Sequence, residues 1–162
     1  MKKTRARATG YDSLYMKKEN TVLNNLIETL KDGQEGFKQA ADGVNDPKLK
    51  SLFRDYSEQR SRFATALQSE ARRHGETEPE TSSSATGALH RGWMNLKSII
   101  TGGDEHAILA ECERGEDSAV EEYKKALDDG LSPSAQEVVV RQFAEIRAAH
   151  DRIRSLRDAT KS

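Results

Sequence analysis

Carboxylates and histidines are the side chains of this sequence that could do chemistry, because helical proteins use them to bind metal ions. The chain of 162 residues holds 27 Asp and Glu residues and four His residues. A di-iron site in a helical bundle needs Glu-x-x-His pairs, since a spacing of three residues puts both ligands on one helical face. The residues three positions before the four histidines are Ala71, Gly87, Gly103 and Arg147. The motif is absent at all four, and the sequence predicts no catalytic residue and no bound cofactor.

A second group of polar residues falls at positions that the apolar pattern assigns to the interior. Arg60 lies in an apolar stripe, beside Tyr56. An Arg is a poor neighbour for a metal pair but a good partner for a carboxylate, so we expect it to form a buried ion pair with Glu116 or Glu35. Such a pair fixes the register of helices while adding little net stability. The predicted buried polar network consists of Arg60, Glu116 and Gln142.

A single weak metal site is the alternative for the same region. Its candidate ligands are Glu35, Glu113, Glu116 and His150. Carboxylate and imidazole ligands suit iron or another divalent metal. The metal alternative predicts an iron-handling protein with a partial site, whereas the ion pair predicts a structural bundle.

Cys112 is the only cysteine, which excludes an intramolecular disulfide and a cysteine-based zinc cage. Antiparallel pairing of the last two helices would set Cys112 level with His150, where a thiolate could be activated. A lone cysteine on a helical stripe is more often a small core residue, and we favour that interpretation.

The string His90-Arg91-Gly92-Trp93 is the most unusual local sequence. Because Trp is costly to expose, we expect Trp93 to pack the connecting segment onto the bundle. The alternative is a patch of His90, Arg91 and Trp93 that binds a partner protein.

Apolar residues recur every three or four positions, which is typical of amphipathic helices. Prolines and glycines mark the ends of these stripes, as at Asp46-Pro47 and Ser132-Pro133. The pattern predicts four long helices near 20–44, 47–75, 104–129 and 133–158, with a short helix inside 85–100.

The composition agrees with an all-α fold. Charged residues make up 33% of the chain and prolines number three, and no apolar run reaches the length of about 18 residues that a membrane span needs. Residues 1–18 hold six Lys or Arg and one Asp, and we expect a disordered basic tail before a four-helix-bundle domain at 19–159. The tail could contact nucleic acid, which we do not favour, and we expect a cytoplasmic protein with no membrane contact.

The connection from Glu76 to Gly103 is too long for a tight turn. Two antiparallel hairpins joined by a long crossover are typical of a ferritin-like four-helix bundle. A plain up-down-up-down bundle with an overlong loop is the alternative.

Several strings, taken together, resemble a bacterial four-helix-bundle family that is catalogued as a domain of unknown function within the ferritin-like superfamily. The resemblance spans about Asn20–Asp158 and implies a ferritin-like fold with a stress-associated role, but no established reaction. We therefore expect a non-catalytic bundle that acts through protein partners or self-association. The alternatives are the iron-handling protein and a DNA-associated stress protein. The strings are Asp32-Gly33-Gln34-Glu35-Gly36-Phe37-Lys38-Gln39-Ala40-Ala41, His90-Arg91-Gly92-Trp93, Gly115-Glu116-Asp117 with Tyr123, and His150-Asp151 with Ile153 and Leu156.

Overall fold

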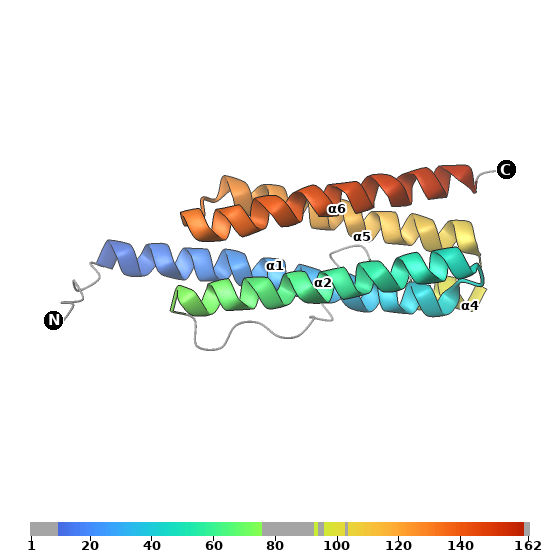
Figure 1. Cartoon of the computed structure of the whole chain (residues 1–162), viewed down its shortest axis with the longest axis horizontal. Coiled ribbons are helices and arrows are strands. Elements are labelled where there is room, and N and C mark those ends of the chain that lie inside the picture. Colours follow the sequence, from blue (N-terminus) through green and yellow to red (C-terminus); the bar gives the residue numbers. More distant parts are fainter. Residues whose placement is uncertain (1–9, 76–92, 94–95, 103, 161–162) are drawn as a thin grey trace.

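A computed structural model of the chain describes residues 10–75, 93, 96–102 and 104–160 (Figure 1). Every regular element within these residues is a helix, which confirms the predicted all-α class with four long helices. None of the described helices is long and apolar enough to cross a membrane. The helices are α1 (Gly10–Gly43), α2 (Pro47–Arg73), α4 (Leu96–Gly102), α5 (Glu105–Asp128) and α6 (Pro133–Ala159).

The turn between α1 and α2 follows the local sequence. Oδ1 of Asp46 accepts a hydrogen bond from the Lys48 amide at 2.8 Å, which satisfies a free amide at the start of α2. Pro47 occupies the first helical position, where its missing amide costs nothing. After α2, Gly75 has a φ of 91°, a conformation that glycine adopts without strain.

The second hairpin is closed by similar local features, with one exception. Asp104 caps α5 by accepting hydrogen bonds from the amides of the first turn, and Gly130 has a φ of 80° in the turn to α6. Ser132 is the N-cap residue of α6, but its hydroxyl makes no capping hydrogen bond. Its own amide instead donates to Oε1 of Glu19 at 2.7 Å, so a side chain from α1 secures the start of α6.

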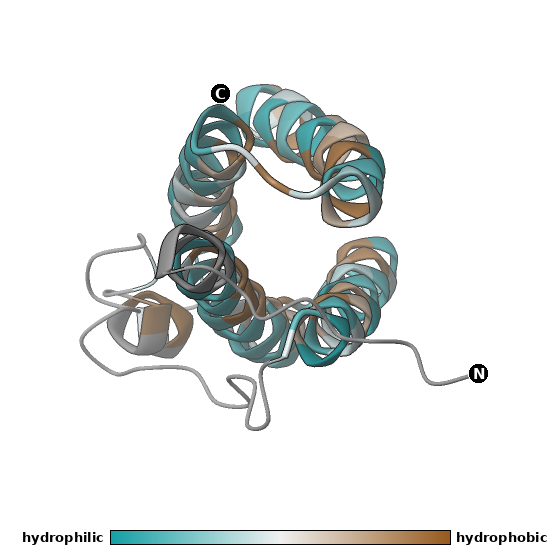
Figure 2. Cartoon of the chain, turned by 90° about the vertical axis from the view of Figure 1, so that its left-hand side faces the viewer, coloured by the Kyte–Doolittle hydropathy of each residue, from teal (hydrophilic) through white to brown (hydrophobic). Residues whose placement is uncertain are grey.

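The four long helices form a bundle in which α1 packs on α2 and α5, and α6 packs on α5 and α2. Viewed end-on, their hydrophobic residues face the centre, and α4 lies outside the ring (Figure 2). At one end of the bundle, Ser132 contacts His74 after α2. At the other end, His106 in the first turn of α5 contacts Thr160 after α6. Helix α5 therefore begins at the end of the bundle opposite to the end where α2 stops.

The interior contains two apolar clusters that are separated along the bundle axis. The first cluster includes Leu26, Leu67 and Tyr123, and the second includes Phe37 and Ile108. On α2, Arg60 lies between Phe53 of the second cluster and Ala64 of the first. On α5, Glu116 lies between Cys112 of the second cluster and Ala119 of the first. A polar layer therefore divides the core.

Two features differ from the sequence prediction. Helix α1 starts at Gly10, about ten residues before the apolar stripe begins, so part of the expected tail is helical. Residues 11–18 contain no Gly or Pro, and each residue added to an existing helix gains a backbone hydrogen bond. The short helix of the connection is α4, which continues past Ile100 to Gly102. The rest of the region predicted for it, 85–92 and 94–95, lies outside the described residues, as do tail residues 1–9.

Candidate functional site

The polar layer is built around an ion pair between Arg60 and Glu116. Nη1 of Arg60 lies 2.5 Å from Oε1 of Glu116, and Nη2 lies 2.8 Å from Oε2. The Arg60 side chain is 1% exposed and that of Glu116 is 0% exposed. Two parallel hydrogen bonds of this kind match the planar guanidinium to the planar carboxylate. The pair joins α2 to α5 through the centre of the bundle.

The residues around Arg60 explain how a guanidinium fits there. Gly33 on α1 faces it, and a β-carbon at this glycine would make ordinary van der Waals contact with Cγ and Nη1 of Arg60 at 3.6 Å. The guanidinium carbon lies 5.3 Å from the centre of the Phe37 ring, a distance suited to a cation–π interaction. Burial alone would lower the pKa of Arg60, but the charge and hydrogen bonds of Glu116 outweigh it, and the net pKa is raised. Arg60 is therefore charged at any physiological pH.

A second buried polar contact lies toward the α5–α6 turn. The Tyr123 hydroxyl donates a hydrogen bond to Oε1 of Gln142 at 2.7 Å, and Nε2 of Gln142 donates to the carbonyl of Phe63 at 3.2 Å. Burial raises the pKa of Tyr123 well above its ordinary value, so the phenol keeps its proton and acts as a donor. Gln142 thus joins α6 to α2 and α5, but it does not contact the ion pair directly.

Glu113, Asp117 and His150 form a third group, between α5 and α6. One ligand atom from each lies within 4.8 Å of those of the other two. Nε2 of His150 lies 2.5 Å from Oδ1 of Asp117, and Nδ1 lies 3.1 Å from Oδ1 of Asp151. Burial alone would lower the pKa of His150, whereas the hydrogen bonds to Asp151 and Asp117 raise it above its ordinary value.

Two arginines balance the charge of this group. Nε of Arg154 lies 3.1 Å from Oε1 of Glu113, and Arg157 forms an ion pair with the other carboxylate oxygen. Glu113 is 7% exposed, while Asp117 is 54% exposed and reaches solvent. The group therefore has a buried side on Glu113 and His150 and an open side on Asp117.

Trp93 lies against the outside of the bundle, in a notch made by two glycines. A β-carbon on Gly36 of α1 or on Gly115 of α5 would overlap the indole ring. The indole also packs edge-on against Phe37, with ring centres 5.2 Å apart. Trp93 thus covers α1 and α5. It lies near the ion pair, because Phe37 contacts both the indole and the Arg60 guanidinium.

Cys112 lies in the second apolar cluster and is fully buried. Burial raises the pKa of its thiol well above the ordinary value, and the negative charges of Glu116 and Glu111 raise it further. Since the two nitrogens of His150 face Asp117 and Asp151, that histidine does not activate the thiol.

Three other residues were singled out from the sequence. Glu35 is exposed on α1, where its carboxylate accepts a hydrogen bond from Gln39, and it does not belong to the group of Glu113, Asp117 and His150. His90 and Arg91 lie outside the described residues, so the partner patch with Trp93 stays a prediction.

Sequence reasoning missed Asp117 and Asp151. The spacing of four between Glu113 and Asp117 on one helical face, opposite His150, could have indicated the group. It also missed the contact of His74 with Glu19, whose nearest atoms lie 3.6 Å apart, because α1 and the end of α2 are distant in sequence at these positions.

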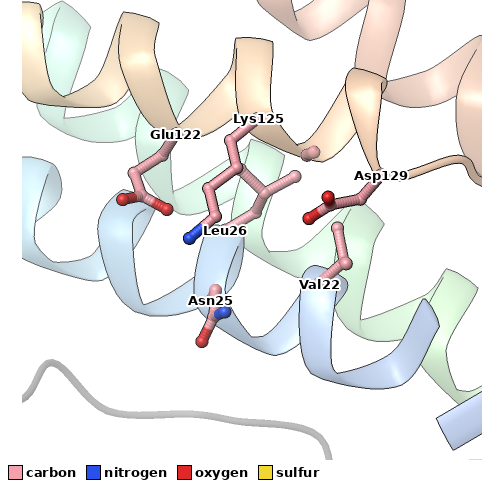
Figure 3. Close-up of a pocket in the computed structure, with 7 residues that line it drawn as sticks. Val22, Asn25, Leu26, Glu122, Lys125 and Asp129 are labelled. Carbon is pink, nitrogen blue, oxygen red and sulfur yellow. The ribbon is translucent and has the colours of Figure 1, made fainter. Parts of the chain in front are cut away.

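A small pocket lies between α1 and α5, away from all of these groups (Figure 3). Its volume of about 10 Å³ accommodates no more than one water molecule. It is lined by Glu122 and Lys125 of α5, by Asp129 just after α5, and by Val22, Asn25 and Leu26 of α1. We assign it no function.

Comparison with known proteins identifies a family without an assigned role. The family model described as "Domain of unknown function (DUF2383)" matches residues 18–129. This range includes Arg60, Glu116 and Trp93 and ends before α6. No curated protein matches the chain.

Proposed function

We propose that this chain, which belongs to the DUF2383 family of unknown function, is a non-catalytic helical bundle that acts through protein partners or self-association. The observation that carries the proposal is the Arg60–Glu116 pair, which occupies the centre of the bundle. A bundle that holds a metal pair uses this space for inward carboxylates and histidines.

The ion pair is a poor starting point for metal chemistry. Both Glu116 oxygens already accept hydrogen bonds from Arg60, and a metal would have to compete with a fixed positive charge. Displacing the guanidinium would leave it buried without a partner, which costs about 3–5 kcal/mol. The pair therefore supports a structural role for the polar layer.

The finer parts of the proposal rest on topology and on the sequence resemblance. Helices α2 and α5 run in the same direction, which supports a ferritin-like arrangement with a crossover along the bundle. The resemblance described above supports a bacterial protein with a stress-associated role, and the composition supports a cytoplasmic location. Together they support the proposal that the chain has kept a ferritin-like scaffold without its metal centre.

Metal analysis and size measurement test the proposal together. Untagged protein from cells grown in iron-rich medium is analysed for iron and assayed for oxygen-dependent oxidation of ferrous iron. We expect neither two iron atoms per chain nor oxidation. Light scattering on the same sample tests for self-association. The measurement after addition of cell extract tests whether the protein enters complexes with other proteins. Two iron atoms per chain with ferrous oxidation would refute the proposal.

A further inference from the structure

We propose that Glu113, Asp117 and His150 bind one divalent first-row transition-metal ion between α5 and α6. The site lies outside the centre of the bundle and goes beyond the proposed function, because a bundle without catalytic activity can hold such an ion. The ligands are two carboxylate oxygens and one imidazole nitrogen, a set that suits Zn²⁺, Mn²⁺ or Fe²⁺.

The backbone places the three metal ligands on the facing surfaces of α5 and α6. Glu113 and Asp117 are one helical turn apart on α5, so both side chains leave the same face. His150 comes from α6, which packs against α5. The three ligand atoms lie within 4.8 Å of one another. The Asp117 side chain is 54% exposed, so solvent reaches the site from this side.

The orientation of His150 is the second observation. Its Nδ1 faces Oδ1 of Asp151 at 3.1 Å, which leaves Nε2 directed at Asp117. Histidines that bind metal almost always donate the other ring N–H to a carboxylate or carbonyl, which fixes the tautomer and makes the ligand nitrogen more basic. Asp151 therefore acts as a positioning residue for Nε2 of His150.

The surrounding charges permit binding but limit its strength. Arg154 and Arg157 contact the two oxygens of Glu113. A carboxylate oxygen has two lone pairs, so Glu113 can keep an arginine and still face an ion. A metal bound at Nε2 would replace the hydrogen bond between His150 and Asp117. The arginines repel a cation, and we expect weaker binding than in a site without them.

A surface cavity of about 300 Å³ completes the site. Asp117 and His150 line it, together with the acidic residues Asp151 and Glu121 and the cationic residues Lys124, Arg147 and Arg154. Three protein ligands leave further coordination positions of the metal open, and a cavity of this size provides space for the water molecules that fill them.

Titration calorimetry with Zn²⁺ on the untagged full-length chain tests the site. We expect one ion per chain, with binding weakened more than about tenfold in Asp117→Asn and His150→Gln, since even loss of a second-shell partner costs about tenfold. Asp151→Asn should weaken binding by about tenfold through His150. Glu121→Gln is the matched control, because it removes a charge beside the same cavity without removing a ligand, and its affinity should stay within about twofold of the parent.

Visible absorption of added Co²⁺ provides a second measurement of direct coordination. The parent chain and Glu121→Gln should show the bands of bound Co²⁺, and His150→Gln should not. If His150→Gln fails to fold by circular dichroism, the exposed Asp117→Asn variant decides. No saturable Zn²⁺ binding in the parent, or equal binding in Asp117→Asn and Glu121→Gln, would overturn the site. Neither result bears on the proposed function, which fails only with two iron atoms and ferrous oxidation.

Discussion

The Trp93 indole and Gly115 are in contact so close that no other residue type fits at position 115 without movement of the ring. A β-carbon there would lie 2.7 Å from Nε1 of the indole and nearer still to two ring carbons. Gly36 meets the opposite part of the same ring in the same way. The two glycines and the indole form one interlocked contact between α1, α5 and the connecting segment.

Gly115→Ala should therefore destabilise the protein, although Ala favours helix more than Gly does. Forcing a methyl group into a filled space costs about 1–3 kcal/mol, against a gain of up to about 1 kcal/mol from helix propensity. The free energy of unfolding, measured by urea denaturation, should fall.

Two comparisons isolate the cause. Gly102→Ala places a methyl group where nothing lies within 4 Å, so this variant should lose no stability. In a Trp93→Ala background, Gly115→Ala should no longer lower the free energy of unfolding. If Gly115→Ala stays as stable as the parent in the presence of Trp93, the interlocked contact is absent in solution.

Removing one partner of the central ion pair should lower the free energy of unfolding substantially. Arg60→Ala leaves Glu116 buried and charged without its partner, and we expect a loss of about 3–5 kcal/mol in the free energy of unfolding. Arg73→Ala is the matched control on the same helix, because Arg73 is 70% exposed, and its buried partner Glu70 keeps its contacts with His74 and Ser134. Its loss should be about 1 kcal/mol or less.

Replacing both partners by apolar residues separates charge from packing. Arg60→Met combined with Glu116→Leu removes the two charges together, and most of the lost stability should return. A double variant as unstable as Arg60→Ala would show that the volume of the layer, and not its charge, is what matters.

The hydrogen bond between Tyr123 and Gln142 has its own test. Tyr123→Phe keeps the ring and removes the hydroxyl, leaving the Gln142 oxygen without the donor it has in the parent. We expect a loss of about 1–3 kcal/mol by thermal or urea denaturation. Gln142 donates separately to the Phe63 carbonyl, so that contact should survive in the variant. If the stability of Tyr123→Phe equals that of the parent within experimental error, a water molecule replaces the hydroxyl as the donor to the Gln142 oxygen.

Cys112 should react with thiol reagents only when the bundle opens. Burial and nearby negative charges raise the pKa of the thiol, so the thiolate is scarce near neutral pH. We expect alkylation in native buffer to be much slower than in denaturant, and to speed up in Arg60→Ala as unfolding becomes more frequent. Fast alkylation of the folded parent would contradict the core position of Cys112.

The helices were predictable because their determinants are local. The Asp46-Pro47 start of α2, the Ser132-Pro133 start of α6 and the apolar stripes are all visible within a few residues of sequence. The start of α1 was not predictable in the same way, because the polar segment 17–21 separates the apolar residues Tyr11, Leu14 and Tyr15 from the long apolar stripe that follows.

The polar groups were predictable only in part. Arg60 stood out because it interrupts an apolar stripe, and the structure pairs it with Glu116. The contacts of His150 with Asp117 and of Glu19 with Ser132 depend on how separate helices align, and exposed carboxylates such as Asp117 look like any other surface residue in the sequence. Long-range pairing of this kind carries no local pattern.

Trp93 is the only tryptophan of the chain, so the intrinsic fluorescence of the protein comes mainly from one position on the bundle surface. The emission maximum of an indole moves to longer wavelength when water reaches it, while circular dichroism follows the helices. A binding event or variant that detaches Trp93 from the bundle would therefore shift the emission maximum without changing the circular dichroism of the helices. Global unfolding would change both together. The molecule thus contains its own optical probe for detachment of the segment that joins its two hairpins.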